Sequence, residues 1–187
     1  YLDIYICRAG PASLDGKKAN LLYINNGDLT FSEQASKYGL ADTSLSTQAA
    51  FFDYDLDGDL DMYQLNHSLH QNGTFGKRVA FGDHHSRAGD QLLRNDGGKF
   101  VPVNEEAGIY GTVIGYGLGV VTGDINNDGW PDIYVGNDFH ENDYLYINQG
   151  NGTFRESLND HIQHTSRFSM GVDIADVNGD KLNDIFT

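Results

Sequence analysis

Three acidic segments hold the residues of this chain that are best suited to chemistry. Each is nine residues long, with aspartate or asparagine at positions 1, 3, 5 and 9, and the segments are 53–61, 124–132 and 176–184. Side chains two residues apart in a tight loop can converge on one point, and hard oxygen ligands of this kind suit Ca²⁺. Gly58 and Gly129, at position 6 of the first two segments, allow the sharp bend that such a loop needs. The spacing therefore predicts about three calcium sites, whose role we expect to be structural.

These segments are not EF-hands. An EF-hand loop has a bidentate glutamate at position 12 and a helix on each side. Position 12 here is Gln64, Val135 or Thr187, and the flanking residues are typical of β-strands. A single Asp/Asn/Gly cluster is also compatible with an ordinary turn. Three copies with one spacing, together with a truncated copy that ends at Asp3, favour metal loops over turns.

The acidic segments recur within a larger repeating unit. Their last aspartates, Asp3, Asp61, Asp132 and Asp184, lie 58, 71 and 52 residues apart. Strand-like pieces fill each interval, and glycine-rich turns between them are typical of antiparallel hairpins. The expected strands are 4–6, 21–25 and 29–32; 48–53, 62–65, 91–95 and 99–103; 117–124, 133–137, 143–148 and 153–157; and 170–175.

Four antiparallel strands per unit predict an all-β fold, a β-propeller of four-stranded blades. The units span roughly 1–47, 48–114, 115–165 and the partial 166–187, all within one propeller domain. We expect the first strand of each blade nearest the axis, because its glycines and alanines leave room where blades crowd. A β-sandwich with calcium in its loops is the alternative, which the repetition of a whole four-stranded unit disfavours. Propellers have four to eight blades, so we expect the remaining blades outside this chain.

The composition narrows the classes of function. Twelve basic and 27 acidic residues give a net charge of −15, which argues against nucleic acid and anionic membranes as partners. No apolar run approaches the roughly 18 residues of a membrane-spanning helix, so direct membrane insertion is not expected. The lone Cys7 excludes an internal disulfide. Calcium loops fill where Ca²⁺ is abundant, which favours an extracellular, cell-surface or periplasmic location.

Several runs of residues resemble a known repeat family. They are Asn-Leu-Leu-Tyr-Ile-Asn-Asn-Gly at 20–27, Arg-Asn-Asp-Gly-Gly-Lys-Phe at 94–100 and Tyr-Ile-Asn-Gln-Gly-Asn-Gly-Thr-Phe-Arg at 146–155. They are similar to the FG-GAP/VCBS repeats of integrin-α-like propellers, in particular the bacterial branch related to cartilage acidic protein, which often carries an ASPIC/UnbV domain. The resemblance covers essentially the whole chain. It implies a seven-bladed propeller of a secreted or surface protein, with Ca²⁺ in the loop between the first two strands of a blade.

The resemblance also implies which residues hold the metal. Side chains at positions 1, 3, 5 and 9 would bind it together with the backbone carbonyl at position 7. The three sets are Asp53, Asp55, Asp57 and Asp61 with the Asp59 carbonyl; Asp124, Asn126, Asp128 and Asp132 with the Trp130 carbonyl; and Asp176, Asn178, Asp180 and Asp184 with the Leu182 carbonyl. Lys181 replaces the glycine of the third loop. We therefore expect a strained bend there and the weakest of the three sites.

The seven histidines fall in connections that a propeller places opposite the acidic loops. We treat these connections as a possible ligand face, because binding residues concentrate in loops on a rigid scaffold. Its candidate residues are His67, His70, His84, His85, Arg87, His140, His161, His164 and Arg167. Solvated or locally hydrogen-bonded histidines are the alternative, and the spacing of His84 and His85 is not a metal motif.

The chain contains no nucleophile-elbow, phosphate-loop or zinc-protease motif. We expect a calcium-stabilised extracellular binding or adhesion scaffold that contacts a protein or a glycan through the loops opposite the acidic segments. The alternative is a polysaccharide lyase or hydrolase on the same propeller, and a structural spacer is a third interpretation. A fold alone does not separate these functions. A pocket that joins a tyrosine or histidine base to an arginine would favour the enzyme.

Overall fold

The computed structural model describes residues 1–10, 18–68, 85, 87–111, 113–139 and 141–187. Its strands follow one another in hairpins along the chain. They are β1 (Ile4–Ile6), β2 (Leu21–Asn25), β3 (Phe31–Glu33), β4 (Ser46–Phe52), β5 (Asp61–Asn66), β6 (Gln91–Asn95), β7 (Phe100–Pro102), β8 (Gly117–Gly123), β9 (Asp132–Asn137), β10 (Tyr144–Asn148), β11 (Phe154–Glu156), β12 (Asp173–Ala175) and β13 (Asp184–Phe186).

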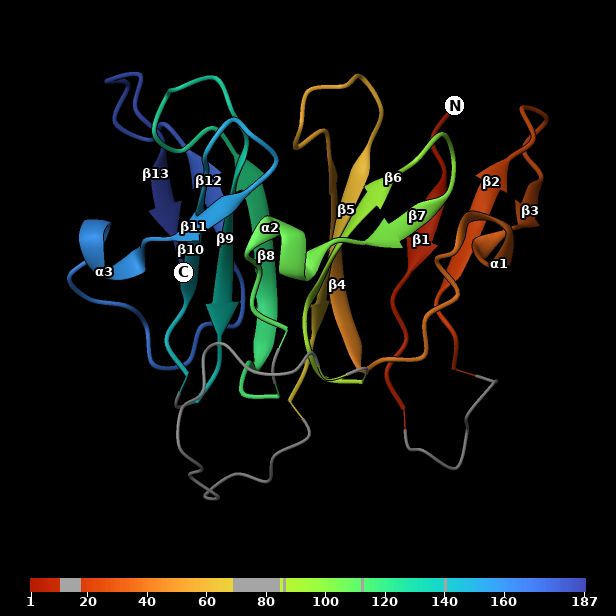
Figure 1. Cartoon of the computed structure of the whole chain (residues 1–187), viewed down its shortest axis with the longest axis horizontal. Helices are drawn as coiled ribbons and strands as arrows, with labels where there is room; N and C mark the ends of the chain where they lie inside the picture. The colour runs from red at the N-terminus through yellow and green to blue at the C-terminus, as the bar shows by residue number, and fades with distance from the viewer. Residues whose placement is uncertain (11–17, 69–84, 86, 112, 140) are drawn as a thin grey trace.

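These strands form four antiparallel sheets that stand side by side in a row (Figure 1). The two middle sheets are complete, with the strand orders β4-β5-β6-β7 and β8-β9-β10-β11. The first sheet has three strands, β1-β2-β3, and the last has two, β12-β13. The all-β architecture of four-stranded antiparallel units is therefore confirmed, and within this chain the sheets form an open row.

The expected strands agree with the observed ones to within a few residues, and two differences have a physical cause or consequence. The third strand starts at Phe31 and not at 29, because Leu29 has a φ of 70° and belongs to the preceding turn. The strand expected at 170–175 is shorter and starts at Asp173. As a result, Met170 is 74% exposed instead of lying within a sheet.

The acidic segments join β4 to β5, β8 to β9 and β12 to β13, so all three lie at the same end of their sheets (Figure 1). The connections from β5 to β6 and from β9 to β10 leave from the opposite end. We call this opposite end the loop face. The fold thus separates two sets of loops by the length of a strand.

The first strands of neighbouring sheets lie against each other, as expected for the innermost strands of blades. The Gln48 side chain bonds to the backbone of Val120 in both directions: its Oε1 accepts from the amide at 3.0 Å and its Nε2 donates to the carbonyl at 3.3 Å. A Cβ added to Gly117 would lie 2.2 Å from Cδ1 of Leu65. Glycine is therefore required where these two sheets meet.

The hydrophobic core fills the spaces between the sheets. Strands β5 and β9 are buried along their whole length, because another sheet covers each face. Tyr63, Leu65 and Tyr146 lie in the cluster between the two middle sheets. Leu22 and Met62 belong to the cluster between the first and second sheets. Each sheet is thus stabilised by its neighbours, as in a repeat protein.

A one-turn helix that the sequence pattern does not predict follows the last strand of each of the first three sheets. These helices are α1 (Ala35–Tyr38), α2 (Asn104–Ala107) and α3 (Leu158–His161). The first two end at Gly39 and Gly108, whose positive φ angles of 83° and 75° favour glycine. Four residues are too few for a helical periodicity to be visible. No helix in the described part of the chain is long and apolar enough to cross a membrane.

Candidate metal loops and the loop face

The first acidic loop folds around the carboxylate of Asp53. That carboxylate accepts hydrogen bonds from the backbone N–H groups of Asp57 and Gly58, at 3.1 and 3.0 Å. Gly58 has a φ of 98°, which supplies the predicted bend at position 6. The loop therefore curls back over its own first residue and brings its side chains together.

Three carboxylates of this loop form a cluster that suits a cation. One oxygen each of Asp53, Asp55 and Asp61 lies within 4.8 Å of the others. Oδ1 of Asp55 and Oδ1 of Asp59 are buried and have no hydrogen-bond partner. A buried carboxylate oxygen without a partner is unfavourable, and a hard cation would satisfy it. The residues thus fit the predicted Ca²⁺.

Burial and closely spaced like charges raise the pKa values of carboxyl groups in the first loop. Burial raises the pKa of Asp61 to about 6. Burial and the charge of the adjacent Asp57 raise the pKa of Asp55 above its ordinary value. Closely spaced like charges repel, so a divalent cation would stabilise this loop in the folded state.

The aspartate at position 9 also fastens each loop to its sheet. Asp61 accepts hydrogen bonds from the N–H groups of Tyr54 and Asn95, at 3.1 and 2.8 Å. The other sheets repeat the arrangement: Asp132 accepts from Ile125 and Asn148, Asp184 from Val177, and Asp3 from Asn25. Position 9 is therefore a structural anchor as well as a candidate ligand.

The second loop has the same backbone arrangement as the first. Asp124 accepts hydrogen bonds from the N–H groups of Asp128 and Gly129, at 3.0 and 2.9 Å. The amide of Asn126 donates to Asp128 at 2.8 Å. The oxygen of the same amide accepts the Asp128 N–H at 3.0 Å. The ligand sets of the second and third loops, and the three position-7 carbonyls, stay predictions.

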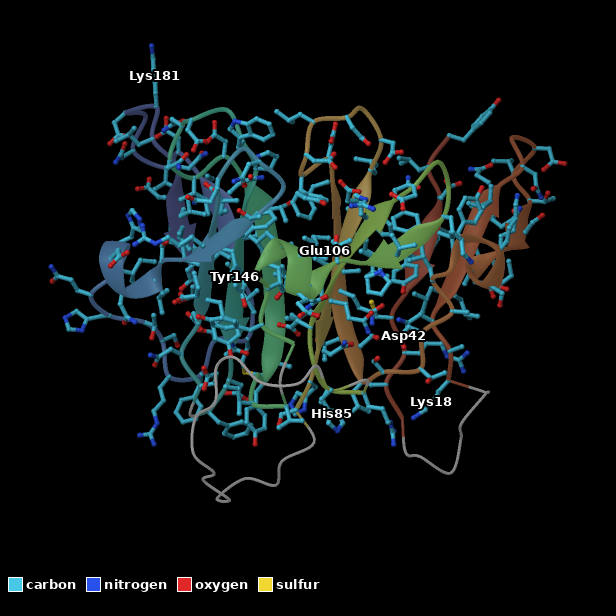
Figure 2. All side chains as sticks on the ribbon, viewed as in Figure 1. Lys18, Asp42, His85, Glu106, Tyr146 and Lys181 are labelled. Carbon is cyan, nitrogen blue, oxygen red and sulfur yellow. The ribbon has the colours of Figure 1, made fainter. Side chains whose placement is uncertain are left out.

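The third loop makes its bend with a lysine. Lys181 has a φ of 71° and donates its N–H to Asp176 at 2.8 Å, in the place of the glycine N–H of the other loops. Its side chain points away from the loop (Figure 2). Position 4 is also left-handed in every loop, and here it is Gly179, with a φ of 79°. The third loop thus moves its glycine from position 6 to position 4, and the left-handed lysine is the source of strain.

A comparison with protein families explains why the three loops share one geometry. The model of the FG-GAP-like repeat matches residues 1–63, 79–135 and 124–187. This chain belongs to the FG-GAP-like repeat family. Each matched segment takes in at least one of the acidic loops, so the loops are part of the repeat itself. No curated protein matches the chain.

In the part of this FG-GAP-like repeat chain that the structure describes, the histidines do not form one cluster. His67 packs edge-on against Tyr116, with ring centroids 5.2 Å apart, and the two residues form a bridge between neighbouring sheets. The backbone N–H of His85 donates to the Gly111 carbonyl at 2.7 Å. Both residues therefore support the connections that contain them. His70, His84 and His140 lie outside the described residues.

The remaining candidates of the loop face occupy different places. His161 ends α3 and lines a cavity with Asn126 of the second acidic loop, so its expected position among the opposite loops is wrong. The one-turn helix, which the sequence analysis missed, turns the chain along the outside of the sheet. Arg87 is half-buried, whereas His164 and Arg167 are exposed. The Arg167 guanidinium lies 5.7 Å from the centre of the Phe168 ring.

A small cavity opens on the loop face beside Phe139. Its volume is about 280 Å³, and it is lined by Phe139, Glu141, Asn142, Thr165, Ser166 and Arg167. The Phe139 ring meets Tyr116 and Phe168 edge-on, with centroid distances of 5.3 and 6.2 Å. Phe139 has a φ of 63°, a conformation that bulky residues rarely adopt. Aromatic surface and two opposite charges thus surround one hollow.

A buried tyrosine–aspartate pair in each middle sheet is the main site feature that the sequence analysis missed. The Tyr63 hydroxyl donates to Asp90 at 2.9 Å, and the Tyr134 hydroxyl donates to Asp143 at 2.7 Å. Each aspartate also accepts a backbone N–H from the end of the preceding strand, at 2.8 Å. The pairs fix the ends of the strands that carry the loop face. Alignment of the two units would have shown the recurring tyrosine and aspartate.

Proposed function

We propose that this FG-GAP-like repeat chain is a calcium-stabilised extracellular scaffold that binds a protein or a glycan through its loop face. FG-GAP repeats are typical of extracellular binding and adhesion proteins, which supports the class of function. We further propose that the chain is part of a seven-bladed propeller of the bacterial branch that often carries an ASPIC/UnbV domain. The rigid sheets would then present the connecting loops to the ligand.

The observation that carries the loop-face proposal is the strained Phe139 beside a cavity. A bulky residue with positive φ is maintained only when its surroundings enforce it, and such residues gather at functional sites. Here the Asp138 carboxylate accepts the Phe139 N–H at 2.9 Å, and the Tyr116 and Phe168 rings pack edge-on against the Phe139 ring. The ring then lines the same hollow as Glu141 and Arg167. The other lining residues are polar or charged, so the hollow offers hydrogen-bonding and charged groups beside one aromatic ring.

Calcium would act on this scaffold from the opposite end of the strands. We propose three ions, held by the ligand sets that the sequence predicts, with the first loop best prepared for binding. Asp53, Asp55 and Asp61 supply clustered oxygens there. Binding to the folded state alone stabilises that state by mass action. The ion would hold the loop without meeting the ligand of the loop face.

The proposal is tested with the whole chain and two matched arginine variants. Arg167→Gln removes the charge beside Phe139, whereas Arg155→Gln removes one that pairs with Asp160 outside the cavity. A glycan array and a panel of extracellular proteins, both in Ca²⁺, identify the ligand, which is then titrated. We expect Arg167→Gln to weaken binding about tenfold, which corresponds to about 1.4 kcal/mol, and Arg155→Gln to leave it unchanged.

Two results would contradict the loop-face scaffold. One is saturable binding that both arginine variants reduce equally. The other is the absence of saturable binding to every glycan and protein of the panel by folded chain. Breakdown of a bound polysaccharide during the titration would instead identify the enzyme alternative.

A further inference from the structure

A second cavity lies between the two complete sheets, on the side of the acidic loops. Its volume is about 400 Å³. The second sheet contributes the first acidic loop, β6 and α2, and the third sheet contributes the second acidic loop and the β10–β11 turn. The lining residues are Tyr54, Asp55, Arg94, Val103, Glu106, Ala107, Trp130, Gly150, Asn151, Gly152 and Thr153. Figure 2 shows Glu106 on α2, where the two sheets adjoin.

The floor of this cavity is apolar and one wall is an indole ring. Tyr54, Val103 and Ala107 are almost completely buried. Trp130 lies against Gly150 so closely that an added Cβ would be 3.0 Å from the indole nitrogen. Gly150 therefore allows the indole to approach the β10–β11 turn closely. Trp130 is the only tryptophan in the chain.

The rim of the cavity has an excess of negative charge. The Arg94 guanidinium is already bound to Asp96, with Nε–Oδ1 and Nη2–Oδ2 distances of 2.7 and 3.2 Å. Glu106 lies 4.0 Å from Arg94 and remains 77% exposed. Its carboxylate is therefore available to a ligand even when Asp55 is engaged by Ca²⁺. The net charge of −15 of the whole chain also favours the approach of a positively charged ligand.

The next joint between sheets shows that this lining is not a general property of the repeat. A cavity of about 420 Å³ occupies the equivalent place between the third and fourth sheets. In that cavity Asn126 occupies the position equivalent to Asp55, and Ile147 occupies the position equivalent to Arg94. Leucine and isoleucine side chains provide most of its wall. The repeat thus provides a cavity at each of these two joints. Asp184 contributes a carboxylate to the second cavity, but only the first combines carboxylates with an indole ring.

From this combination we infer that the Trp130 cavity is a second interaction site, which accepts a lysine or arginine side chain of a protein partner. A cation is attracted to the face of an aromatic ring, and tryptophan is the strongest such partner. The alkyl part of a basic side chain fits the apolar floor while its charged end reaches the rim. Glu106 supplies the opposite charge. This site lies at the other end of the strands from the loop face and does not depend on it.

Trp130 also provides a direct signal for the test, because it is the only tryptophan of the chain. Its backbone carbonyl is a candidate calcium ligand, so the calcium concentration is kept constant. The folded chain in Ca²⁺ is titrated with the capped tripeptide acetyl-Gly-Lys-Gly-amide, its arginine counterpart, and the uncharged norleucine counterpart. We expect saturable changes in tryptophan emission with lysine and arginine peptides, weakening as NaCl is added, and no saturable change with norleucine.

Two variants on the same helix turn provide the matched comparison. Glu106→Gln removes the rim carboxylate, and Glu105→Gln removes the adjacent exposed carboxylate that does not line the cavity. Both residues are exposed, so both variants should retain the fold, which melting curves verify. We expect Glu106→Gln to weaken binding of the lysine peptide about threefold, which is the range of an exposed charge pair. Glu105→Gln should leave this binding unchanged.

Equal weakening by the two variants would overturn the inference, because it would show attraction to the acidic surface in general. A saturable response to norleucine, or to a neutral oligosaccharide instead of the basic peptides, would overturn it as well. No saturable response to any probe in the folded chain would exclude the site.

Discussion

At the scale of single residues, some aspartates of the acidic loops anchor the loop to its sheet, and others are available mainly to bind a cation. Asp61 is 1% exposed and holds two backbone N–H groups, so it stabilises the fold without any ion. Asp57 is exposed and accepts one N–H, from Asp59 at 3.0 Å. An asparagine at 57 retains that acceptor and loses only charge. The two aspartates should therefore respond differently to calcium.

We predict that Asp61→Asn lowers the free energy of unfolding by about 1–3 kcal/mol already in chelator, because an amide has one acceptor oxygen where the carboxylate has two. The loss should be larger in calcium, because Asp61 is also a candidate ligand. Asp57→Asn should lower the free energy of unfolding in calcium only, by about 1.4 kcal/mol for each tenfold loss of affinity. Urea unfolding in the two buffers measures both effects. Identical losses for Asp57→Asn with and without calcium would contradict its role as a ligand.

The left-handed glycines of the loops offer a second test at this scale. Gly129 has a φ of 91°, and a Cβ there would meet no atom within 4 Å, so its cost would be purely conformational. Gly171 has the same open space without a positive φ. We predict that Gly129→Ala destabilises the chain by about 1–2 kcal/mol, while Gly171→Ala has almost no effect. Equal unfolding free energies for the two variants would argue against a strained bend.

The buried Asp90 predicts a pH dependence. Burial raises its pKa to about 7 from an ordinary value of 3.8. The folded chain therefore retains a proton that the unfolded chain releases above pH 4. The contribution of Asp90 is most stabilising below the unfolded pKa and decreases as pH rises to 7, by on the order of 4 kcal/mol.

Asp90→Asn should remove this contribution, because the amide is neutral at every pH. We expect the difference in unfolding free energy between the variant and the original chain to change between pH 4 and 7 in favour of the variant, and to stay constant above pH 8. Calorimetry in chelator measures it without the competing titration of calcium binding. A difference that does not vary with pH would show that Asp90 is ionised throughout.

At the scale of elements, the sequence predicts the strands well because period, turn residues and repetition agree. The expected strand 91–95 is β6 itself, and the position-6 glycines have the left-handed angles that a sharp bend requires. The helices were missed because one turn has no periodicity. The pairs of Tyr63 with Asp90 and of Tyr134 with Asp143 were missed because their spacings differ, 27 residues in one unit and 9 in the other. His161 was misplaced because α3 redirects the chain.

The contact between the second and third sheets, where β8 meets β4 and β5, predicts that Gly117 and Leu65 are energetically coupled. Gly117→Ala places a Cβ against Leu65, which should destabilise the chain by about 1–3 kcal/mol. Leu65→Ala leaves a cavity in the core and should lose about 2–5 kcal/mol. Because the new methyl group partly fills that cavity, the double variant should lose less than the sum. Urea unfolding of the four chains measures the coupling, and strict additivity would contradict the contact.

At the scale of the whole molecule, the two ends of the strands carry different kinds of loop. One end carries acidic loops of nearly constant geometry, and the other carries connections of variable length. The sheets between them are stabilised by contact with their neighbours, so the loss of one loop should weaken more than its own hairpin. The net charge of −15 adds a general repulsion that bound cations would reduce. Calcium is therefore expected to control the stability of the entire chain.

The most direct test of this account is the melting temperature of the chain in calcium and in chelator. A calcium concentration a hundredfold above Kd should contribute about 2.7 kcal/mol per filled site. For a chain of 187 residues this raises the melting temperature by about 5–10 °C per site. We predict a rise of that size, increasing with the logarithm of calcium concentration and reduced in Asp57→Asn. Identical melting curves in calcium and chelator would contradict the central claim that these loops are calcium sites that stabilise the fold.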